Sequence, residues 1–133
     1  MREFTIDHAV SAISAHTGSL NSFWGLFIVA TFSAGGFGAS MGDEFTPSIA
    51  AILCIAFLAF ATAHLRILLM TLRKQAILID EVRGRFQADP ESFTDYPRSV
   101  VAMLEPTFSV RITLLVHLTI DACVIGVVAA AAL

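Results

Sequence analysis

The chain has 133 residues, which is enough for a single domain. Hydrophobic residues make up 56% of it and charged residues only 14%, whereas about a quarter of an average soluble protein is charged. The composition therefore excludes an ordinary soluble domain and favours a membrane protein. Basic and acidic residues are interleaved between positions 66 and 111, and the formal net charge is -3, so no nucleic-acid partner is expected.

Residues 1–19 are predicted to form an amphipathic helix, because Ile6, Val10 and Ile13 recur at spacings of four and three. Acidic residues stand where a signal peptide would carry its basic start, so the first apolar stretch is interpreted as a permanent helix. This helix could lie on the cytoplasmic interface or run straight into the first span. A break is favoured by small and polar residues, namely Gly18, Ser19 and Asn21.

The first predicted transmembrane span covers residues 20–41, which contain no Asp, Glu, Lys or Arg. A helix of about 20 apolar residues is long enough to cross a bilayer. Trp24 is expected at headgroup depth, where an indole ring is well accommodated.

Two stripes of small residues suggest close helix packing. In the first span they recur every four residues, at Ala30, Ala34, Gly38 and Gly42, and in the third at Ala122, Gly126 and Ala130. Small side chains allow two membrane helices to approach closely. The two stripes are therefore candidates for contact with each other or with a partner, and permissive packing in alanine-rich segments is the alternative.

The second span is predicted over residues 47–72, starting at a Thr46–Pro47 cap. An apolar seam continues the helix to about residue 83, before a loop at 84–109; its residues are Leu65, Leu68, Leu72, Ile79, Val82 and Phe86. The extension fits either a coiled coil or an amphipathic helix that packs on its own loop.

The third span is predicted over residues 110–133 and contains Asp121 near its middle. A carboxylate at that depth must face the interior of the protein, a partner or water. Thr113 and His117 precede it at spacings of four, so the three side chains form a polar stripe on one helix face. The stripe is open to three interpretations: a hydrogen-bonded seam between helices, an ion pair with another subunit, or a proton or ion path.

His64 on the second span is expected at a depth close to that of His117, so the two could meet across helices, and Thr62 could join them. The four histidines show no regular ligand spacing, so neither a metal site nor a cofactor is predicted. Cys54 and Cys123 are interpreted as free buried thiols, although similar depth makes a disulfide conceivable. No nucleophile, paired-carboxylate or phosphate-loop motif is present, so the chain is not expected to be an enzyme.

The basic residues predict the orientation. With three spans, all eight lysines and arginines lie on one side of the membrane or at its interface. By the positive-inside rule, the N-terminus and the large loop are cytoplasmic and the C-terminus lies outside the inner membrane. Arg66 and Arg111 are expected to reach the phosphate headgroups.

The sequence thus predicts an all-α fold: one integral membrane domain, a three-helix bundle with an amphipathic N-terminal helix and a long second helix that extends into the cytoplasm. The layout is typical of small bacterial membrane proteins. The leading hypothesis is a non-catalytic accessory or assembly subunit of a larger membrane complex, or a homo-oligomer. It rests on the small-residue stripes, on the helical extension and on the absence of an evident partner for Asp121.

Two other hypotheses remain open. One is an oligomeric pore, holin-like pores included, or a small proton- or ion-coupled transporter that uses the Thr113–His117–Asp121 stripe. The other is a membrane anchor or sensor that recruits a soluble partner through its cytoplasmic segment. The expected partners are the lipid bilayer and other membrane subunits or further copies of the chain.

Overall fold

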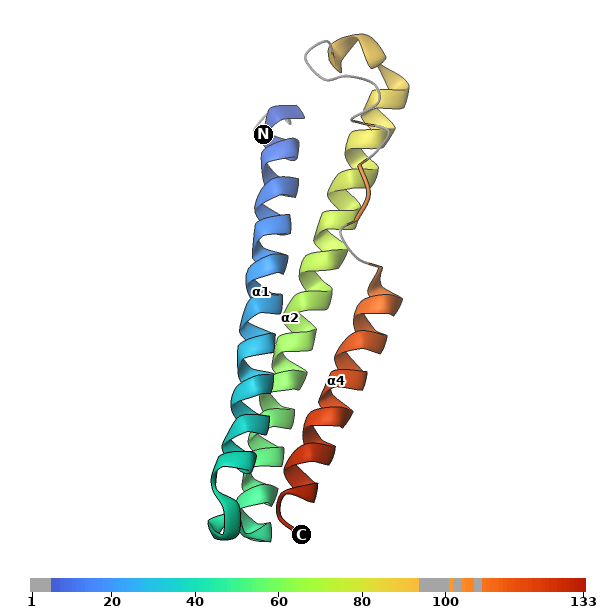
Figure 1. Ribbon diagram of the computed structural model, residues 1–133. Coiled ribbons are helices and arrows are strands. Elements are labelled where there is room, and N and C mark those ends of the chain that lie inside the picture. The colour runs from blue at the N-terminus through green and yellow to red at the C-terminus, as the bar shows by residue number, and fades with distance from the viewer. Residues whose placement is uncertain (1–5, 94–100, 102–103, 107–108) are drawn as a thin grey trace.

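The computed structural model describes residues 6–93, 101, 104–106 and 109–133. Its main elements are three long α-helices, α1 (Ile6–Ser40), α2 (Pro47–Ala88) and α4 (Val110–Ala130), with short 3-10 turns η1 (Gly42–Glu44) and η2 (Pro90–Phe93). The predicted all-helical fold is confirmed. Figure 1 shows α1 and α2 running antiparallel side by side, with α4 packed beside the half of α2 that is nearer to η1.

Helix α1 is continuous from Ile6 to Ser40, so the predicted break at residues 18–21 is wrong. The hydroxyls of Ser19 and Ser22 donate to backbone carbonyls four residues earlier, at 3.0 and 3.1 Å, instead of capping a new helix. The packing explains the continuity, because the buried residues Ile13, Leu20 and Phe27 recur every seven positions. One seam of α1 thus faces α2 through the whole of that stretch.

The connection between α1 and α2 is tight and well capped. Gly42 has a φ of 52°, a left-handed conformation that glycine adopts without strain. It is the first residue of η1 and lies beyond the end of α1. The Thr46 side chain accepts a hydrogen bond from the backbone N–H of Ile49 at 3.4 Å, and Pro47 is the first helical residue. The predicted start of α2 is confirmed.

Helix α2 continues past Gly84 to Ala88, five residues beyond the predicted end. Asp89 closes it, and Pro90, which cannot continue a helix hydrogen-bond ladder, follows directly. The seam of the extension packs inside the molecule: Ile79 and Val82 form a cluster with Ala9 and Ile13 of α1 and with residues after α2, namely Phe93 and Val101. Within the predicted loop at 84–109, residues 84–88 belong to α2 and residues 90–93 to η2, and residues 94–100, 102–103 and 107–108 lie outside the described residues.

Helix α4 begins at Val110 as predicted, and the Ser109 side chain caps it by accepting from the Ile112 N–H at 3.2 Å. At about 1.5 Å per residue, its 21 residues span about the 30 Å of a hydrocarbon core. Helices α1 and α2, with 35 and 42 residues, are much longer than such a core is thick.

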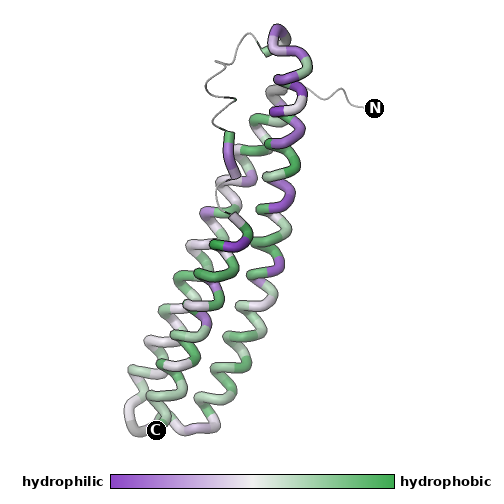
Figure 2. The backbone as a smooth tube through the Cα atoms, turned by 90° about the vertical axis from the view of Figure 1, so that its right-hand side faces the viewer, coloured by the Kyte–Doolittle hydropathy of each residue, from purple (hydrophilic) through white to green (hydrophobic). Residues whose placement is uncertain are grey.

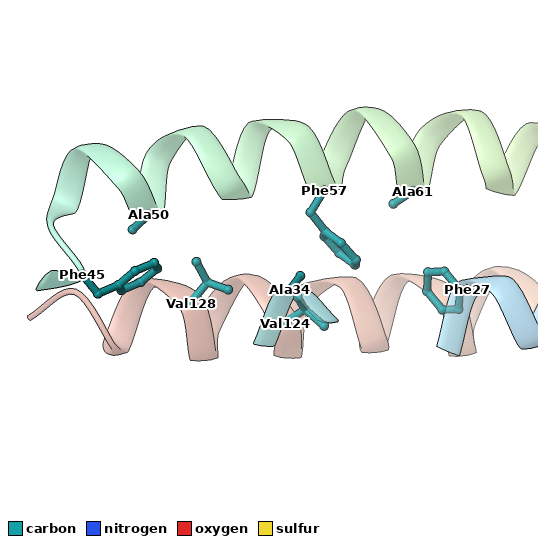
Figure 3. Packing of buried hydrophobic residues seen from close by; sticks show 8 residues of the cluster. All are labelled: Phe27, Ala34, Phe45, Ala50, Phe57, Ala61, Val124 and Val128. Carbon is teal, nitrogen blue, oxygen red and sulfur yellow. The ribbon is translucent and has the colours of Figure 1, made fainter. Parts of the chain in front are cut away.

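The end of the molecule that carries η1 and the C-terminus has an apolar core. Figure 3 shows Ala50 and Phe57 of α2 pointing toward Ala34 of α1 and toward Val124 and Val128 of α4. Farther along, a second apolar cluster joins α1 and α2 through buried leucines, namely Leu20, Leu68 and Leu72.

Hydropathy divides the molecule lengthwise. In Figure 2 hydrophobic residues dominate toward the C-terminal end, and hydrophilic residues are frequent toward the opposite end. By length and composition, all three helices are able to span a membrane. Large apolar side chains also cover much of the outer surface, for example Phe32, Ile52, Ile55 and Leu115. These features indicate a small multi-pass membrane protein.

Candidate functional site

The buried face of α4 carries the polar residues that the sequence singled out. Positions three or four apart share one side of an α-helix, and the buried residues of α4 follow this spacing: Thr113, His117, Asp121, Val124 and Val128. The same periodicity on α2 turns His64 inward between Ala61 and Leu68. The predicted stripe therefore faces the interior, and His64 faces it from the neighbouring helix.

Two histidines and one aspartate are in direct contact there. His64 Nδ1 lies 3.1 Å from His117 Nε2, and His117 Nδ1 lies 2.9 Å from Asp121 Oδ2. His64 Nε2 lies 2.9 Å from the backbone carbonyl oxygen of Phe23. Hydrogen bonds thus connect α4 to α2 and α2 to α1 at one level of the molecule. We call His64, His117 and Asp121 the His–Asp network.

The chemistry of the partners fixes part of the proton arrangement. A backbone carbonyl oxygen can only accept, so His64 must carry a hydrogen on Nε2 and donate it to Phe23. When His64 is neutral, its Nδ1 is therefore an acceptor, and His117 donates to it from Nε2. His117 Nδ1 then shares a hydrogen with Asp121 Oδ2, and that hydrogen belongs to the imidazolium or to the carboxyl group.

Aromatic rings enclose the two imidazoles. The Phe27 ring stacks on His117 at a centroid distance of 4.0 Å and on His64 at 5.2 Å. Phe60 stacks on His64 at 5.6 Å, and Trp24 packs on His117 at 6.3 Å. The faces of these rings favour a positive charge on an imidazole.

Two polar atoms beside the network have no hydrogen-bond partner: Asp121 Oδ1 and Thr113 Oγ1 are both buried. Asp121 is 8% exposed and Thr113 1%. A buried acceptor without a donor is costly unless a water or another group satisfies it. The network therefore has unused hydrogen-bonding capacity on α4.

His117 is the partner of Asp121, for which the sequence showed no evident partner. It lies one turn earlier on the same helix, and its side chain is fully buried against the carboxylate. This pairing within the chain removes the argument that Asp121 requires a basic residue from another subunit.

Other singled-out residues lie elsewhere. Thr62 is exposed on α2 and is not part of the network. Trp24, expected at headgroup depth, lies beside the buried His117. Arg66 and Arg111 have exposed side chains. Both thiols are free; Cys54 is partly buried and Cys123 is exposed. Within the described ranges, no group of three or more His, Cys, Asp or Glu side chains could hold a metal ion.

The two small-residue stripes do not face each other. On α1, Ala34 and Gly38 point inward, and a Cβ at Gly38 would lie 3.3 Å from Phe45 and 3.9 Å from Ala131. On α4, Ala122, Gly126 and Ala130 are all exposed. The predicted contact between the stripes is therefore wrong, because the α4 stripe lies on the outer surface.

Four contributors to the interior were not identified from the sequence. The Phe23 carbonyl is invisible to residue-type reasoning. Phe27 and Phe60 each lie four or seven residues from a buried position, which is the spacing of residues on one helix face. Many phenylalanines in this chain have such a spacing, so it did not single out these two. Gln75, a polar residue in an apolar seam, was a usable signal: it is 1% exposed and donates to Thr17 Oγ1 at 2.8 Å.

Comparison with known proteins adds no functional assignment. The chain matches no protein-family model, no curated protein and no solved structure.

Proposed function

We propose that this protein is a non-catalytic subunit of a membrane assembly, in which the outer face of α4 packs against another transmembrane helix. The other helix belongs to a second copy of the chain or to a larger membrane complex. The observation that carries the proposal is the orientation of the α4 stripe, because Ala122, Gly126 and Ala130 are small and point away from the rest of the chain.

The geometry of α4 supports this role. Gly126 follows His117 by nine residues, so it lies on the opposite side of an α-helix. A Cβ added at Gly126 would meet nothing within 4 Å, so the protein's own packing does not require glycine there. Small residues on an outward face are instead typical of helix–helix contacts in membranes, where they allow the backbones to approach closely.

Purification in mild detergent tests the proposal. We expect a species larger than the monomer, and we expect Gly126→Leu to convert it to the monomer because the side chain would separate the two helices. Gly36→Leu is the matched control, since Gly36 is also exposed and open but lies on α1. A wild-type monomer, or equal behaviour of the two variants, would contradict the proposal.

Cross-linking distinguishes the two kinds of assembly. Cys123 is exposed on α4 within one turn of Gly126, so a Cys54→Ala protein carries a single thiol near the proposed contact. In membranes, a bis-maleimide is expected to link two copies of the chain in a homo-oligomer, which gives a product of twice the mass of the chain. A complex with another chain should give a cross-linked product of a different mass. A Cys54→Ala, Cys123→Ala, Ile55→Cys protein, with the thiol moved to an exposed position of α2, should cross-link less.

We further propose that the protein lies in the inner membrane with the α2 extension in the cytoplasm and the C-terminus outside. The support is that the described basic residues lie toward one end of the molecule, from Arg66 through Arg85 on α2 and at Arg111 on α4. Alkaline phosphatase fused after Leu133 should be active, and a fusion at Gly84 should be inactive. The reverse pattern would overturn the orientation.

A second candidate function is proton- or ion-coupled transport, and the His–Asp network is the observation that favours it. The apolar core around Phe57 and Val128 separates this network from the η1 end, so a complete path would need an interface between subunits. Liposome proton flux that falls in Asp121→Asn would support this candidate. Flux equal to that of empty liposomes would exclude it.

A further inference from the structure

We propose that His64, His117 and Asp121 form one proton-binding site. With the proton bound, the three side chains together carry one hydrogen more than two neutral imidazoles and one carboxylate would carry. The ligand is the proton itself, and its binding completes the hydrogen bonds that join α1, α2 and α4. This inference does not depend on the proposed assembly, because all of its atoms belong to one chain.

Counting hydrogens supports the proposal. The network contains three hydrogen bonds: His64 to the Phe23 carbonyl, His64 to His117, and His117 to Asp121. Each needs one hydrogen, whereas two neutral imidazoles and a carboxylate supply only two. One additional proton therefore satisfies every bond, and it also brings the net charge of the group to zero. In a buried apolar setting a neutral, fully hydrogen-bonded group is strongly favoured over a charged one.

The added proton is shared along the network. When the Asp121 Oδ2–H bond breaks and a His117 Nδ1–H bond forms, the group passes from three neutral side chains to an imidazolium–carboxylate pair without a change in total charge. The stacked Phe27 ring stabilises the imidazolium form. The two forms are therefore two arrangements of one bound proton, which the three side chains share.

Loss of that proton breaks the connection between helices. One of the three bonds is then left without a hydrogen, and a negative charge stays buried. Because a hydrogen bond to a carboxylate is stronger than one between neutral groups, His117 keeps its hydrogen on Nδ1 toward Asp121. The lone pairs of His64 Nδ1 and His117 Nε2 then face each other at 3.1 Å. Asp121 Oδ1 is buried and has no hydrogen-bond partner, so it is a second carboxylate acceptor that is free to take a hydrogen. Proton binding at this site is thus coupled to the contact between α2 and α4.

The surroundings isolate the site from other titrating groups. The residues against it are Phe23, Trp24 and Phe27 on α1 and Phe60 on α2, none of which titrates in the physiological range. On α4 the neighbouring inward residues are Thr113 and Val124. The cations nearest in sequence, Arg66 and Arg111, have exposed side chains. Among the described residues in contact with the network, only its own three members carry the proton.

The Asp121→Asn variant can keep the three hydrogen bonds of the network without the added proton. An asparagine amide can donate a hydrogen to His117 Nδ1, which leaves His117 Nε2 to donate to His64 and His64 Nε2 to donate to Phe23. All three bonds are then complete with no added proton and no charge. The variant should therefore fold like the wild type but lack the proton that the wild type can release.

Histidine NMR across a pH series tests the proposal on the full chain in lipid nanodiscs. The protein carries ¹⁵N-labelled histidine, with His8→Gln and His16→Gln so that only His64 and His117 contribute. We expect both imidazoles to change together in one transition that involves one proton, and we expect that transition to be absent in Asp121→Asn. Thr119→Ala, an exposed change on α4, should leave it in place.

Two results would overturn the inference. The first would be separate transitions for His64 and His117 in the protein whose network is unchanged, because the two imidazoles would then bind protons independently. In Asp121→Asn, retention of the joint transition would show that the carboxyl group does not carry the proton.

Discussion

Two levels in the interior of this protein are held together in different ways. Near η1 the contacts are apolar, between Phe57, Val124 and Val128 among others. In the middle of the molecule they are the hydrogen bonds of the His–Asp network. In a membrane, lipid tails are as apolar as leucine, so apolar contacts gain only from close packing, whereas buried polar groups depend on having their partners. The apolar level should therefore tolerate substitution and the polar level should not.

The largest effect is expected for His117→Ala. His117 is the central member of the network, and its loss removes two hydrogen bonds and leaves the Asp121 carboxylate buried without a partner. Breaking a buried pair in this way costs about 3 kcal/mol or more of unfolding free energy. Reversible unfolding in mixed micelles measures the change, with Thr119→Ala as the exposed control on the same helix. A loss below about 1 kcal/mol would mean that the network does not hold the helices together.

A smaller effect is expected at the apolar level for Phe57→Ala. The Phe57 ring is buried between the helices (Figure 3), so its removal creates a cavity. We expect a loss of about 2 kcal/mol, less than in a water-soluble core because lipid replaces water as the reference environment. The same unfolding assay checks the value. A loss larger than that of His117→Ala would reverse the proposed contrast between the two levels.

The smallest effect is expected for the hydrogen bond between Gln75 and Thr17, which joins α2 to α1 away from the network. Neither group is charged, so loss of the bond leaves no buried charge behind. A double-mutant cycle of Gln75→Leu and Thr17→Val should give a coupling of about 0.6 kcal/mol. A coupling comparable with the effect of His117→Ala would show that neutral and ionisable hydrogen bonds contribute alike.

Periodicity explains what could be predicted from the sequence. Hydrophobic runs gave the three helices, and the cap at Thr46–Pro47 follows from local chemistry. The start of α4 at Val110 was predicted, but its Ser109 cap was not. The inward position of Thr113, His117 and Asp121 was also predictable, because spacings of four place residues on one face. The continuity of α1 was not, since the packing of Ile13 and Leu20 against α2 overrides the local preference of Gly18 and Ser19.

The network itself required three-dimensional information. The sequence suggested that His64 and His117 could meet, but their contact depends on the rotation of two helices about their axes. The Phe23 carbonyl fixes the tautomer of His64, and no pattern of residue types reveals a backbone acceptor on a third helix. The outward direction of the α4 stripe was instead predictable from the inward position of His117, because Gly126 follows His117 by nine residues and therefore lies on the opposite side of the helix.

The N–H···N hydrogen bond between His64 and His117 is the central contact of the His–Asp network, and it can be observed directly. In ¹⁵N-histidine protein reconstituted in bilayers, with His8→Gln and His16→Gln, solid-state NMR should detect a coupling between His64 Nδ1 and His117 Nε2, with His64 Nε2 protonated. The coupling should disappear in His64→Phe. Two uncoupled imidazoles, or a His64 that is protonated on Nδ1 and bare on Nε2, would contradict the account.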